Sequence, residues 1–289
     1  MADFVVKKLQ TEGFETVYYY SGEQHNETVV LLHGSGPGAS GITNWKHALE
    51  VMGENYQVIA PDLVGFGDTG IPQNTKMTFW EWTTLRIKQI LAILDHHNVE
   101  KAHLVGNSMG GIISLNAVMY DESRFDKLIL MGSGGGTTNG PTPEIIRMKN
   151  FFNDPTIEAF RNLTKWFVYD ERTLGDNLEE IVQTRYQNVM REGISALYPT
   201  LLPFNPMEAL IPPSALRRIK QQVLLVHGYE DQFVPKESSL SLLEHLPNAE
   251  LVLLKECGHW VQLEKPTKFI QLVDQFIKQH QNTLEKRGG

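Results

Sequence analysis

Short apolar runs alternate with longer amphipathic stretches along most of the chain. Eight of the apolar runs have the length of strands, and they are residues 4–8, 15–20, 28–32, 56–60, 102–105, 127–131, 223–226 and 251–254. Apolar residues at helical spacing predict helices over residues 45–52, 78–98 and 267–280. Because strands and helices alternate, the pattern predicts an α/β fold with a mostly parallel, eight-stranded sheet flanked by helices on both faces.

The alternation breaks after the sixth predicted strand. A glycine-rich stretch over residues 132–140 is followed by a long segment whose pattern predicts helices alone. We therefore expect a helical lid, residues 138–214, inserted into a core domain formed by residues 1–137 and 215–289.

Three pairs of residues predict where helices of this lid begin. Thr142–Pro143 and Asp154–Pro155 each combine a capping side chain with a proline at the first helical position. Asp176 and Glu179 have the spacing of a capping box.

Composition narrows the classes of partner. The chain of 289 residues has a net charge of −8 and no cluster of basic residues, so nucleic acid and anionic membrane surfaces are poor candidates. Because Cys257 is the only cysteine, the chain can form neither an intramolecular disulfide nor a zinc-knuckle site. The first residues lack the pattern of a secretory signal, and no apolar segment has the length of a membrane span. We therefore expect a cytoplasmic protein that acts on a small molecule.

The pentapeptide Gly106-Asn107-Ser108-Met109-Gly110 lies between an apolar strand and an apolar helix. In this context G-x-S-x-G predicts a nucleophile elbow, a turn too tight for side chains at its two glycines. The hydroxyl of Ser108 would stand at a helix N-terminus, where partial positive charge favours a developing anion. The sequence thus predicts Ser108 as a nucleophile.

A serine nucleophile needs a base, and the base needs an acid that orients it, in the chain order serine, acid, histidine. The strand over residues 223–226 leads to Glu230 and Asp231, which compete for the acid role, and the acid-x-x-Val-Pro pattern favours Asp231. His259 follows the last strand and is the predicted base. His33 and His227 each precede a glycine at a strand end, and we expect them to brace loops.

Negative charge on a reacting oxygen needs backbone donors. The amide of Met109, next to the nucleophile, is one candidate. The amide of Ser35 is the other, because the glycines at 34 and 36 let this loop approach a substrate closely. No pair of histidines has the spacing of a helical metal site, so we expect neither a metal nor another cofactor.

With these residues in place, the chain resembles the α/β-hydrolase superfamily over essentially its whole length. Within it, the chain is similar to the meta-cleavage product hydrolases, enzymes of bacterial aromatic degradation that cleave a carbon–carbon bond in 2-hydroxy-6-oxo-dienoates. Four segments carry this closer resemblance, and they are residues 32–41 with Asn44-Trp45, residues 60–67, residues 106–111 and residues 257–260.

The resemblance implies a set of substrate-binding residues. Asn44, Asn107 and Trp260 should line the polar end of the pocket, beside the backbone of Gly34 and Gly36. A lid arginine of the family binds the carboxylate or dienolate oxygen of the substrate, and the matching position is Arg185, with Arg191 as a weaker alternative.

Independently of the family, Arg185 falls within an apolar stripe at helical spacing, formed by Leu178, Ile181, Val182, Tyr186 and Val189. An arginine on a buried face usually has an anionic partner. The partner would be either the substrate or a nearby glutamate.

The resemblance therefore implies a cofactor-independent hydrolase of dienoates, from a family whose members are often homodimers or higher homo-oligomers. A carboxylesterase that acts on small esters would use the same triad without needing Arg185. A ligand-binding receptor with a vestigial triad is a rival of another class, and Ser108 excludes a hydrolase with an aspartate nucleophile. The sequence does not decide whether the dienoate carries an alkyl or an aryl side group, although the chain is more similar to the branch of the family that takes small substituents. The sequence also does not decide whether Ser108 forms an acyl-enzyme or activates a water molecule.

Overall fold

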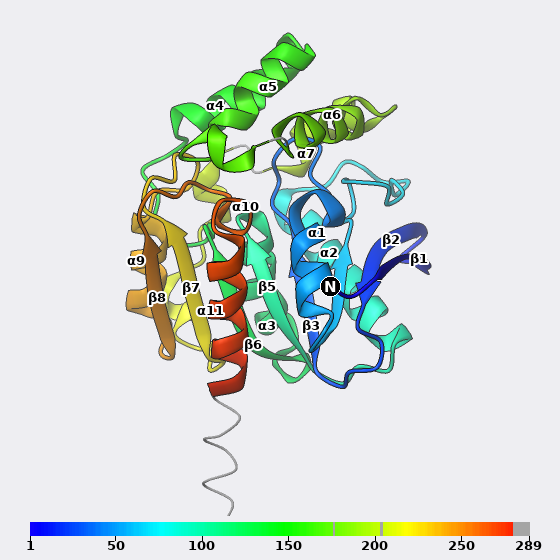
Figure 1. Ribbon diagram of the computed structural model, residues 1–289, viewed down its shortest axis with the longest axis vertical. Coiled ribbons are helices and arrows are strands. Elements are labelled where there is room, and N and C mark those ends of the chain that lie inside the picture. The colour runs from blue at the N-terminus through cyan, green and yellow to red at the C-terminus, as the bar shows by residue number, and fades with distance from the viewer. Residues whose placement is uncertain (176, 203–204, 280–289) are drawn as a thin grey trace, which may run out of the picture.

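A computed structural model of the chain describes residues 1–175, 177–202 and 205–279. Within these residues, eight strands form one sheet in the order β1-β2-β4-β3-β5-β6-β7-β8 (Figure 1). The strands are β1 (Phe4–Thr11), β2 (Phe14–Ser21), β3 (Thr28–Leu32), β4 (Gln57–Pro61), β5 (Ala102–Asn107), β6 (Phe125–Met131), β7 (Val223–Gly228) and β8 (Ala249–Leu254). β2 is antiparallel to both of its neighbours, and all other neighbouring pairs are parallel. The predicted fold class is confirmed.

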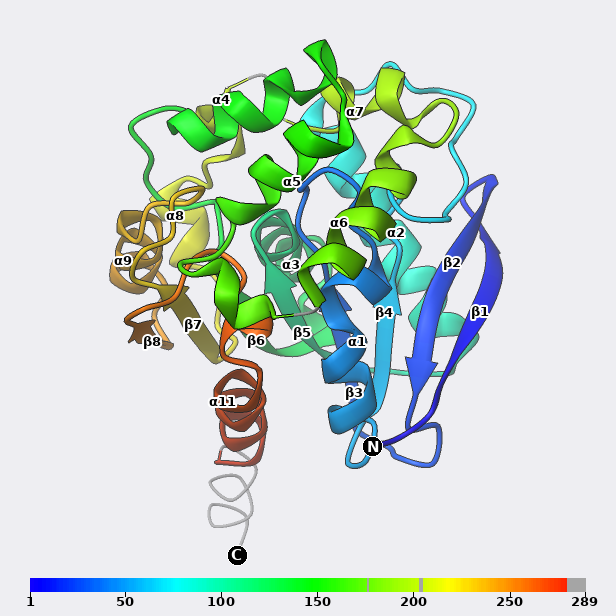
Figure 2. The ribbon, with the colours of Figure 1, turned by 45° about the horizontal axis from the view of Figure 1, so that its top comes forward.

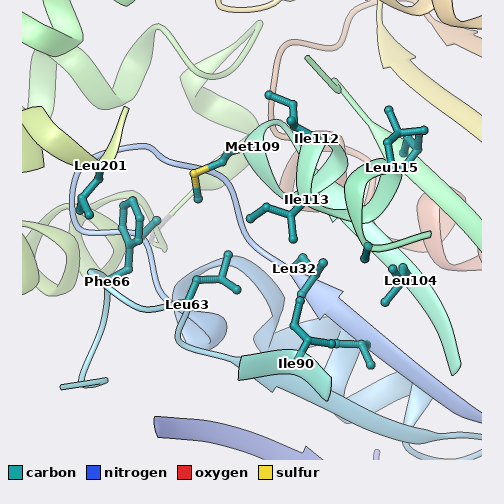
Figure 3. Close-up of a cluster of buried hydrophobic side chains, with 14 of the residues drawn as sticks. Leu32, Leu63, Phe66, Ile90, Leu104, Met109, Ile112, Ile113, Leu115 and Leu201 are labelled. Carbon is teal, nitrogen blue, oxygen red and sulfur yellow. The ribbon is translucent and has the colours of Figure 1, made fainter. Parts of the chain in front are cut away.

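The sheet is buried on both faces. Alternate residues of its central strands point to opposite faces, and each set packs in its own hydrophobic cluster. Val29 and Leu31 pack with α1 (Gly41–Met52) and α11 (Pro266–Gln279). Val30 and Leu32 pack with α2 (Phe79–His96), α3 (Met109–Tyr120) and α9 (Glu237–His245) on the other face. This second cluster continues upward past Leu63 and Phe66 to Leu201 (Figure 3), so the core and the segment above it share one apolar interior.

The segment between β6 and β7 is helical, as the sequence indicates. It contains α4 (Pro143–Asn150), α5 (Ile157–Lys165), α6 (Asn177–Met190), α7 (Ile194–Leu201) and α8 (Pro213–Leu216). Figures 1 and 2 show α4 to α7 lying across the end of the sheet at which the parallel strands terminate. The loops that follow β3, β5 and β7 therefore end beneath these helices.

Most predicted helices form with small shifts of their ends. The helix expected at 45–52 begins earlier, at Gly41, because Ser40 and Thr43 form a capping box that the sequence analysis did not use. Thr142 caps α4 with Pro143 at its first turn, as predicted. The prediction at Asp154–Pro155 is wrong, because α5 is capped by Thr156 instead.

The side chains of Asp154 and Thr156 explain why α5 begins after Thr156. The hydroxyl of Thr156 accepts a hydrogen bond from the amide of Ala159, whereas Asp154 ends the preceding short helix. Asp176, predicted to cap α6 with Glu179, lies outside the described residues.

Candidate active site

The turn between β5 and α3 has the backbone of a nucleophile elbow. Ser108 adopts φ 56° and ψ −113°, a left-handed conformation that a non-glycine residue rarely takes. A Cβ atom on Gly106 would lie 2.4 Å from the carbonyl oxygen of Gly110, and one on Gly110 would lie 2.3 Å from that of Leu32. Side chains are therefore excluded at both glycines, and the turn presents Ser108 above the sheet.

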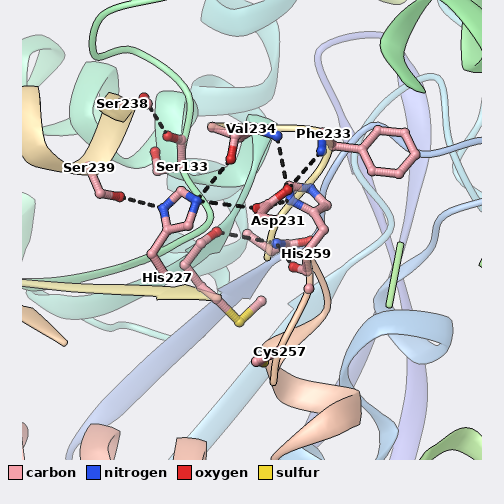
Figure 4. A network of polar contacts seen from close by, with 12 residues as sticks. Ser133, His227, Asp231, Phe233, Val234, Ser238, Ser239, Cys257 and His259 are labelled. Carbon is pink, nitrogen blue, oxygen red and sulfur yellow. Dashed lines mark hydrogen bonds and ion pairs between the residues drawn. The ribbon is translucent and has the colours of Figure 1, made fainter. Parts of the chain in front are cut away.

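His259 contacts one of the two candidate acids. Its Nδ1 lies 2.7 Å from Oδ2 of Asp231 (Figure 4). Oε2 of Glu230 instead accepts a hydrogen bond from the amide of Cys257. Because a carboxylate only accepts, Nδ1 of the imidazole must carry the proton and Nε2 is left as an acceptor. No direct hydrogen bond joins Ser108 to His259 among the described residues, but both side chains line the same cavity.

The carboxylate of Asp231 is buried and saturated with donors. Oδ1 accepts the amides of Phe233 and Val234 at 2.8 and 2.9 Å. Oδ2 faces Nε2 of His227 at 3.4 Å in addition to His259. Burial alone would raise the pKa of Asp231, but the two histidines and the hydrogen bonds outweigh it and lower that pKa well below its usual range. Asp231 is therefore held as a carboxylate.

The loop after β3 lies close to Ser108. A Cβ atom on Gly34 would be only 3.1 Å from Cβ of Ser108, so glycine permits this approach. Neither the amide of Ser35 nor that of Met109 donates to an acceptor within the part of the chain that the structure describes. The two candidate oxyanion donors thus belong to segments that meet at Ser108.

Arg185 lies fully inside the protein, with 1% of its surface exposed. Its Nη2 donates to Oδ1 of Asn44 at 2.6 Å, and its guanidinium carbon lies 4.3 Å from the ring centroid of Trp260. Nε has no hydrogen-bond partner, and no carboxylate forms an ion pair with Arg185 among the described residues. Burial lowers the pKa of Arg185 to about 9, still high enough to keep the cation at neutral pH.

The predicted site residues gather in one cavity, except Asp231, which lies behind His259. The polar part is lined by Gly34, Ser35, Gly36, Asn44, Asn107, Ser108, Arg185, His259 and Trp260. Arg191, the alternative lid arginine, instead pairs with Asp68 at the surface, 3.0 Å away.

A second, largely apolar part of the cavity begins at Ser108 on the other side. Its apolar lining is contributed by Phe79, Met109, Ile112, Ile145, Met148, Leu202, Ala209, Leu210, Phe233, Val234 and Pro235. Lys149 is the one charged residue that this lining contains within the described part of the chain. Ser35, Ser108 and Phe233 border both parts, so the two compartments meet at the serine hydroxyl.

Two phenylalanines shape the site in a way that the sequence analysis missed. The rings of Phe167 and Phe233 stack with centroids 3.8 Å apart, and Phe167 also stacks on Trp260 at 4.5 Å. The carbonyl of Phe167 accepts the amide of His259 at 2.8 Å. Phe167 lies in the segment whose pattern predicts helices alone, and only the fold reveals its contact with His259.

His33 and His227 brace loops, as predicted. His33 joins Leu63 to Gly34, and His227 joins Ser239 to Val234 (Figure 4). Among the described residues, no group of three or more His, Cys, Asp or Glu could hold a metal ion. Nor does this part of the chain contain a helix long and apolar enough to cross a membrane.

Comparison with known proteins finds a matching family and similar hydrolases. The family described as alpha/beta hydrolase fold matches residues 27–266. The 2-hydroxy-6-oxononadienedioate/2-hydroxy-6-oxononatrienedioate hydrolase of Paraburkholderia phymatum is 35% identical over 91% of each chain. The 2-hydroxymuconate semialdehyde hydrolase of Pseudomonas sp. is 31% identical over 94% of this chain and 93% of the relative.

Among solved structures, a 2-hydroxy-6-oxo-6-phenylhexa-2,4-dienoate hydrolase from Rhodococcus sp. superposes with a TM-score of 0.91. It is 35% identical and covers 96% of this chain and 100% of its own. The chain therefore belongs to the α/β-hydrolase fold family and, within it, to the meta-cleavage product hydrolases, enzymes that act on carbon–carbon bonds.

Proposed function

We propose that the protein hydrolyses 2-hydroxy-6-oxo-dienoates with Ser108, His259 and Asp231 as its triad. The observation that carries the proposal is the buried cation of Arg185, which lacks a carboxylate partner among the described residues and lies in the compartment that borders Ser108. An unpaired buried charge is costly, so it points to an anionic ligand. The carboxylate or dienolate oxygen of the substrate supplies that anion.

The remaining residues have roles that follow from their positions. Asn44 holds Nη2 of Arg185, and Trp260 supports the guanidinium by a cation–π contact. Asn107 lines the same compartment. The scissile bond then lies near Ser108, and the side group extends into the apolar compartment.

Bond cleavage uses the protonation state of the Asp231–His259 pair. Nδ1–H of His259 is held by Asp231, so Nε2 accepts the proton of Ser108 or of a water that Ser108 orients. The amides of Ser35 and Met109 stabilise the oxyanion formed at the ketone carbon. The dienol first tautomerises to a keto form, whose carbonyl accepts the electron pair of the scissile bond. Water adds to the other ketone carbon, the C–C bond breaks, and the products are a 2-hydroxydienoate and a carboxylic acid. The helical segment 138–214 acts as a lid over the core of residues 1–137 and 215–289.

The composition of the apolar compartment bears on the side group. Its wall is formed mainly by aliphatic and aromatic side chains, and Lys149 is the one charged residue among the described residues that line it. An uncharged alkyl or aryl group loses little on entering such a wall, whereas a carboxylate would lose its hydration. We propose that the preferred substrate carries an uncharged side group.

The test is stopped-flow absorbance with the ring-opened products of catechol, 3-methylcatechol and 2,3-dihydroxybiphenyl, run beside p-nitrophenyl acetate. Rapid bleaching of a dienoate with slow ester hydrolysis supports the proposal and ranks the side groups. Fast ester hydrolysis with inert dienoates would make the protein a carboxylesterase. Ser108→Ala should abolish turnover but still bind the dienoate, and full activity in that variant would remove the serine from the mechanism.

A further inference from the structure

The helical segment above the sheet touches the candidate oxyanion loop, residues 33–40, at two backbone carbonyls. The hydroxyl of Tyr198, in α7, donates to the carbonyl of Ser35 at 2.5 Å. The side chain of Asn188, in α6, donates to the carbonyl of Gly38 at 3.1 Å. Of these two bonds, only that of Tyr198 reaches the residue whose amide faces the reacting atoms.

Ser35 joins two peptide planes, and each plane has its own support. The first contains the carbonyl of Gly34 and the amide of Ser35. Nε2 of His33 accepts the amide of Leu63 at 3.0 Å, so Nδ1 carries the proton and donates to the Gly34 carbonyl at 2.7 Å. Because C=O and N–H point in opposite directions in a trans peptide, this bond turns the Ser35 amide away from His33.

The second plane contains the carbonyl of Ser35 and the amide of Gly36. Its support comes from Tyr198, which lies on the far side of the loop from the core. Glycine flanks Ser35 on both sides, so the backbone has little intrinsic preference for one orientation. Without the hydroxyl of Tyr198, the Ser35 carbonyl is held by nothing else among the described residues.

Tyr198 is itself held rigidly. Only 1% of its surface is exposed. Its ring packs edge-on against Phe66, with centroids 6.3 Å apart, and at a tilt against Phe152, with centroids 5.0 Å apart. A buried hydroxyl needs a partner, so removing either side of this bond leaves a polar atom unsatisfied. The position of α7 is thus transmitted directly to the backbone of Ser35.

We propose that Tyr198 is a positioning residue that couples the seating of the lid to formation of the oxyanion hole. When the lid is seated, Tyr198 fixes the second peptide plane and the Ser35 amide points at the oxyanion. When the lid lifts, that plane is released, so the backbone of Ser35 is held on one side only, by the bond from His33, and its amide is no longer fixed in direction. This inference rests on the proposed roles of Ser35 and Met109 and adds a control that acts through the lid.

The test compares Tyr198→Phe with Tyr186→Phe. Tyr186 is a matched control because its hydroxyl donates to the carbonyl of Pro155 inside the lid, far in the chain from the loop. Both variants lose one buried or half-buried tyrosine hydroxyl and keep the ring. We measure kcat and KM for p-nitrophenyl acetate, and the inhibition constant of phenylboronic acid, whose tetrahedral serine adduct places an oxygen in the oxyanion hole.

Tyr198→Phe should lower kcat about tenfold, the loss expected from one hydrogen bond that acts on the transition state. It should weaken phenylboronic acid by a similar factor, while KM changes less than about twofold. Tyr186→Phe should leave all three values near those of the parent. Introducing p-aminophenylalanine at position 198 restores a donor and should recover most of the activity, which also covers the case in which the phenylalanine variant folds poorly.

Equal effects of the two phenylalanine variants, or a loss in KM alone, would overturn the proposal. An unchanged inhibition constant for phenylboronic acid in Tyr198→Phe would do the same. The ester and boronic acid report on the oxyanion hole whatever the natural substrate is. Inert dienoates would therefore refute the proposed function without deciding this inference.

Discussion

Replacing Arg185 with methionine should lower the activity on dienoates and raise the stability of the protein. If Arg185 were only structural, the substitution would lower both. Methionine fills a similar volume without charge, so the variant loses the anion contact but keeps the packing. Losing a charge-assisted hydrogen bond to the substrate carboxylate costs about 1.5–3 kcal/mol, or roughly 10- to 100-fold in kcat/KM for the dienoate. Hydrolysis of p-nitrophenyl acetate, which carries no anion, should change less than about threefold.

The same substitution should stabilise the free protein. Burial lowers the pKa of Arg185 from its usual range to about 9, which corresponds to a penalty of roughly 5 kcal/mol on the charged form. The lost bond to Asn44 and the lost contact with Trp260 offset about 3–4 kcal/mol of that. A net gain of about 1 kcal/mol raises the melting temperature by about 2 °C in a chain of this size.

The assay is stopped-flow kinetics on both substrates together with a thermal melt. The matched control is Arg191→Met, since Arg191 is also a lid arginine but forms a surface ion pair with Asp68. Such a pair contributes about 1 kcal/mol or less, so this variant should keep its activity on both substrates and melt no higher than the parent. If Arg185→Met loses both activities equally and melts at a lower temperature, Arg185 is a structural residue and the reasoning fails.

Three further predictions concern the triad and the elbow. Asp231→Asn should lower kcat about 10³- to 10⁴-fold because the amide no longer fixes the tautomer of His259, whereas Glu230→Gln should lower it less than about threefold, and similar losses would refute the assignment. Because the pKa of Asp231 is lowered in the folded state, its ionisation contributes stability above about pH 4 that is lost as the pH falls further. Urea melts of Asp231→Asn should therefore show a flatter fall in unfolding free energy below about pH 4, and an unchanged slope would contradict the shift. Gly110→Ala should destabilise the protein by about 3 kcal/mol or more in urea melts, because its methyl meets the Leu32 carbonyl, while Gly13→Ala, with nothing within 4 Å, should cost about 1 kcal/mol; equal losses would contradict the steric argument.

The sequence predicts those parts of the site that depend on local backbone geometry. Gly106 and Gly110 are required by the turn itself, so the elbow is visible without the fold. The apolar stripe around Arg185 likewise reports its burial from helical spacing alone. At Asp154 and Thr156, two capping side chains stand two residues apart, and the pattern does not say which one completes the hydrogen bond.

Other contacts join positions that are remote in the chain, and no local pattern encodes them. His227 reaches Ser239 across a loop and a helix turn. Tyr198 reaches Ser35 across 163 residues. Such partners become evident only when the sheet brings the loops after β3, β5 and β7 to one edge.

The lid carries both Arg185, the cation proposed to bind the substrate, and Tyr198, whose hydroxyl donates to the carbonyl of Ser35. Without an anion, the buried charge of Arg185 opposes seating of α6, and α7 follows α6 directly in the chain. Binding of an anion removes that penalty. The seated lid is then stabilised by the difference between the binding free energies of the ligand for the seated and the lifted lid. In the proposed coupling, an anion that stabilises the seated lid also stabilises the bond from Tyr198 to Ser35. A substrate carboxylate would therefore strengthen the support of Ser35, whereas a neutral ester would not, so the same triad should favour dienoates over esters.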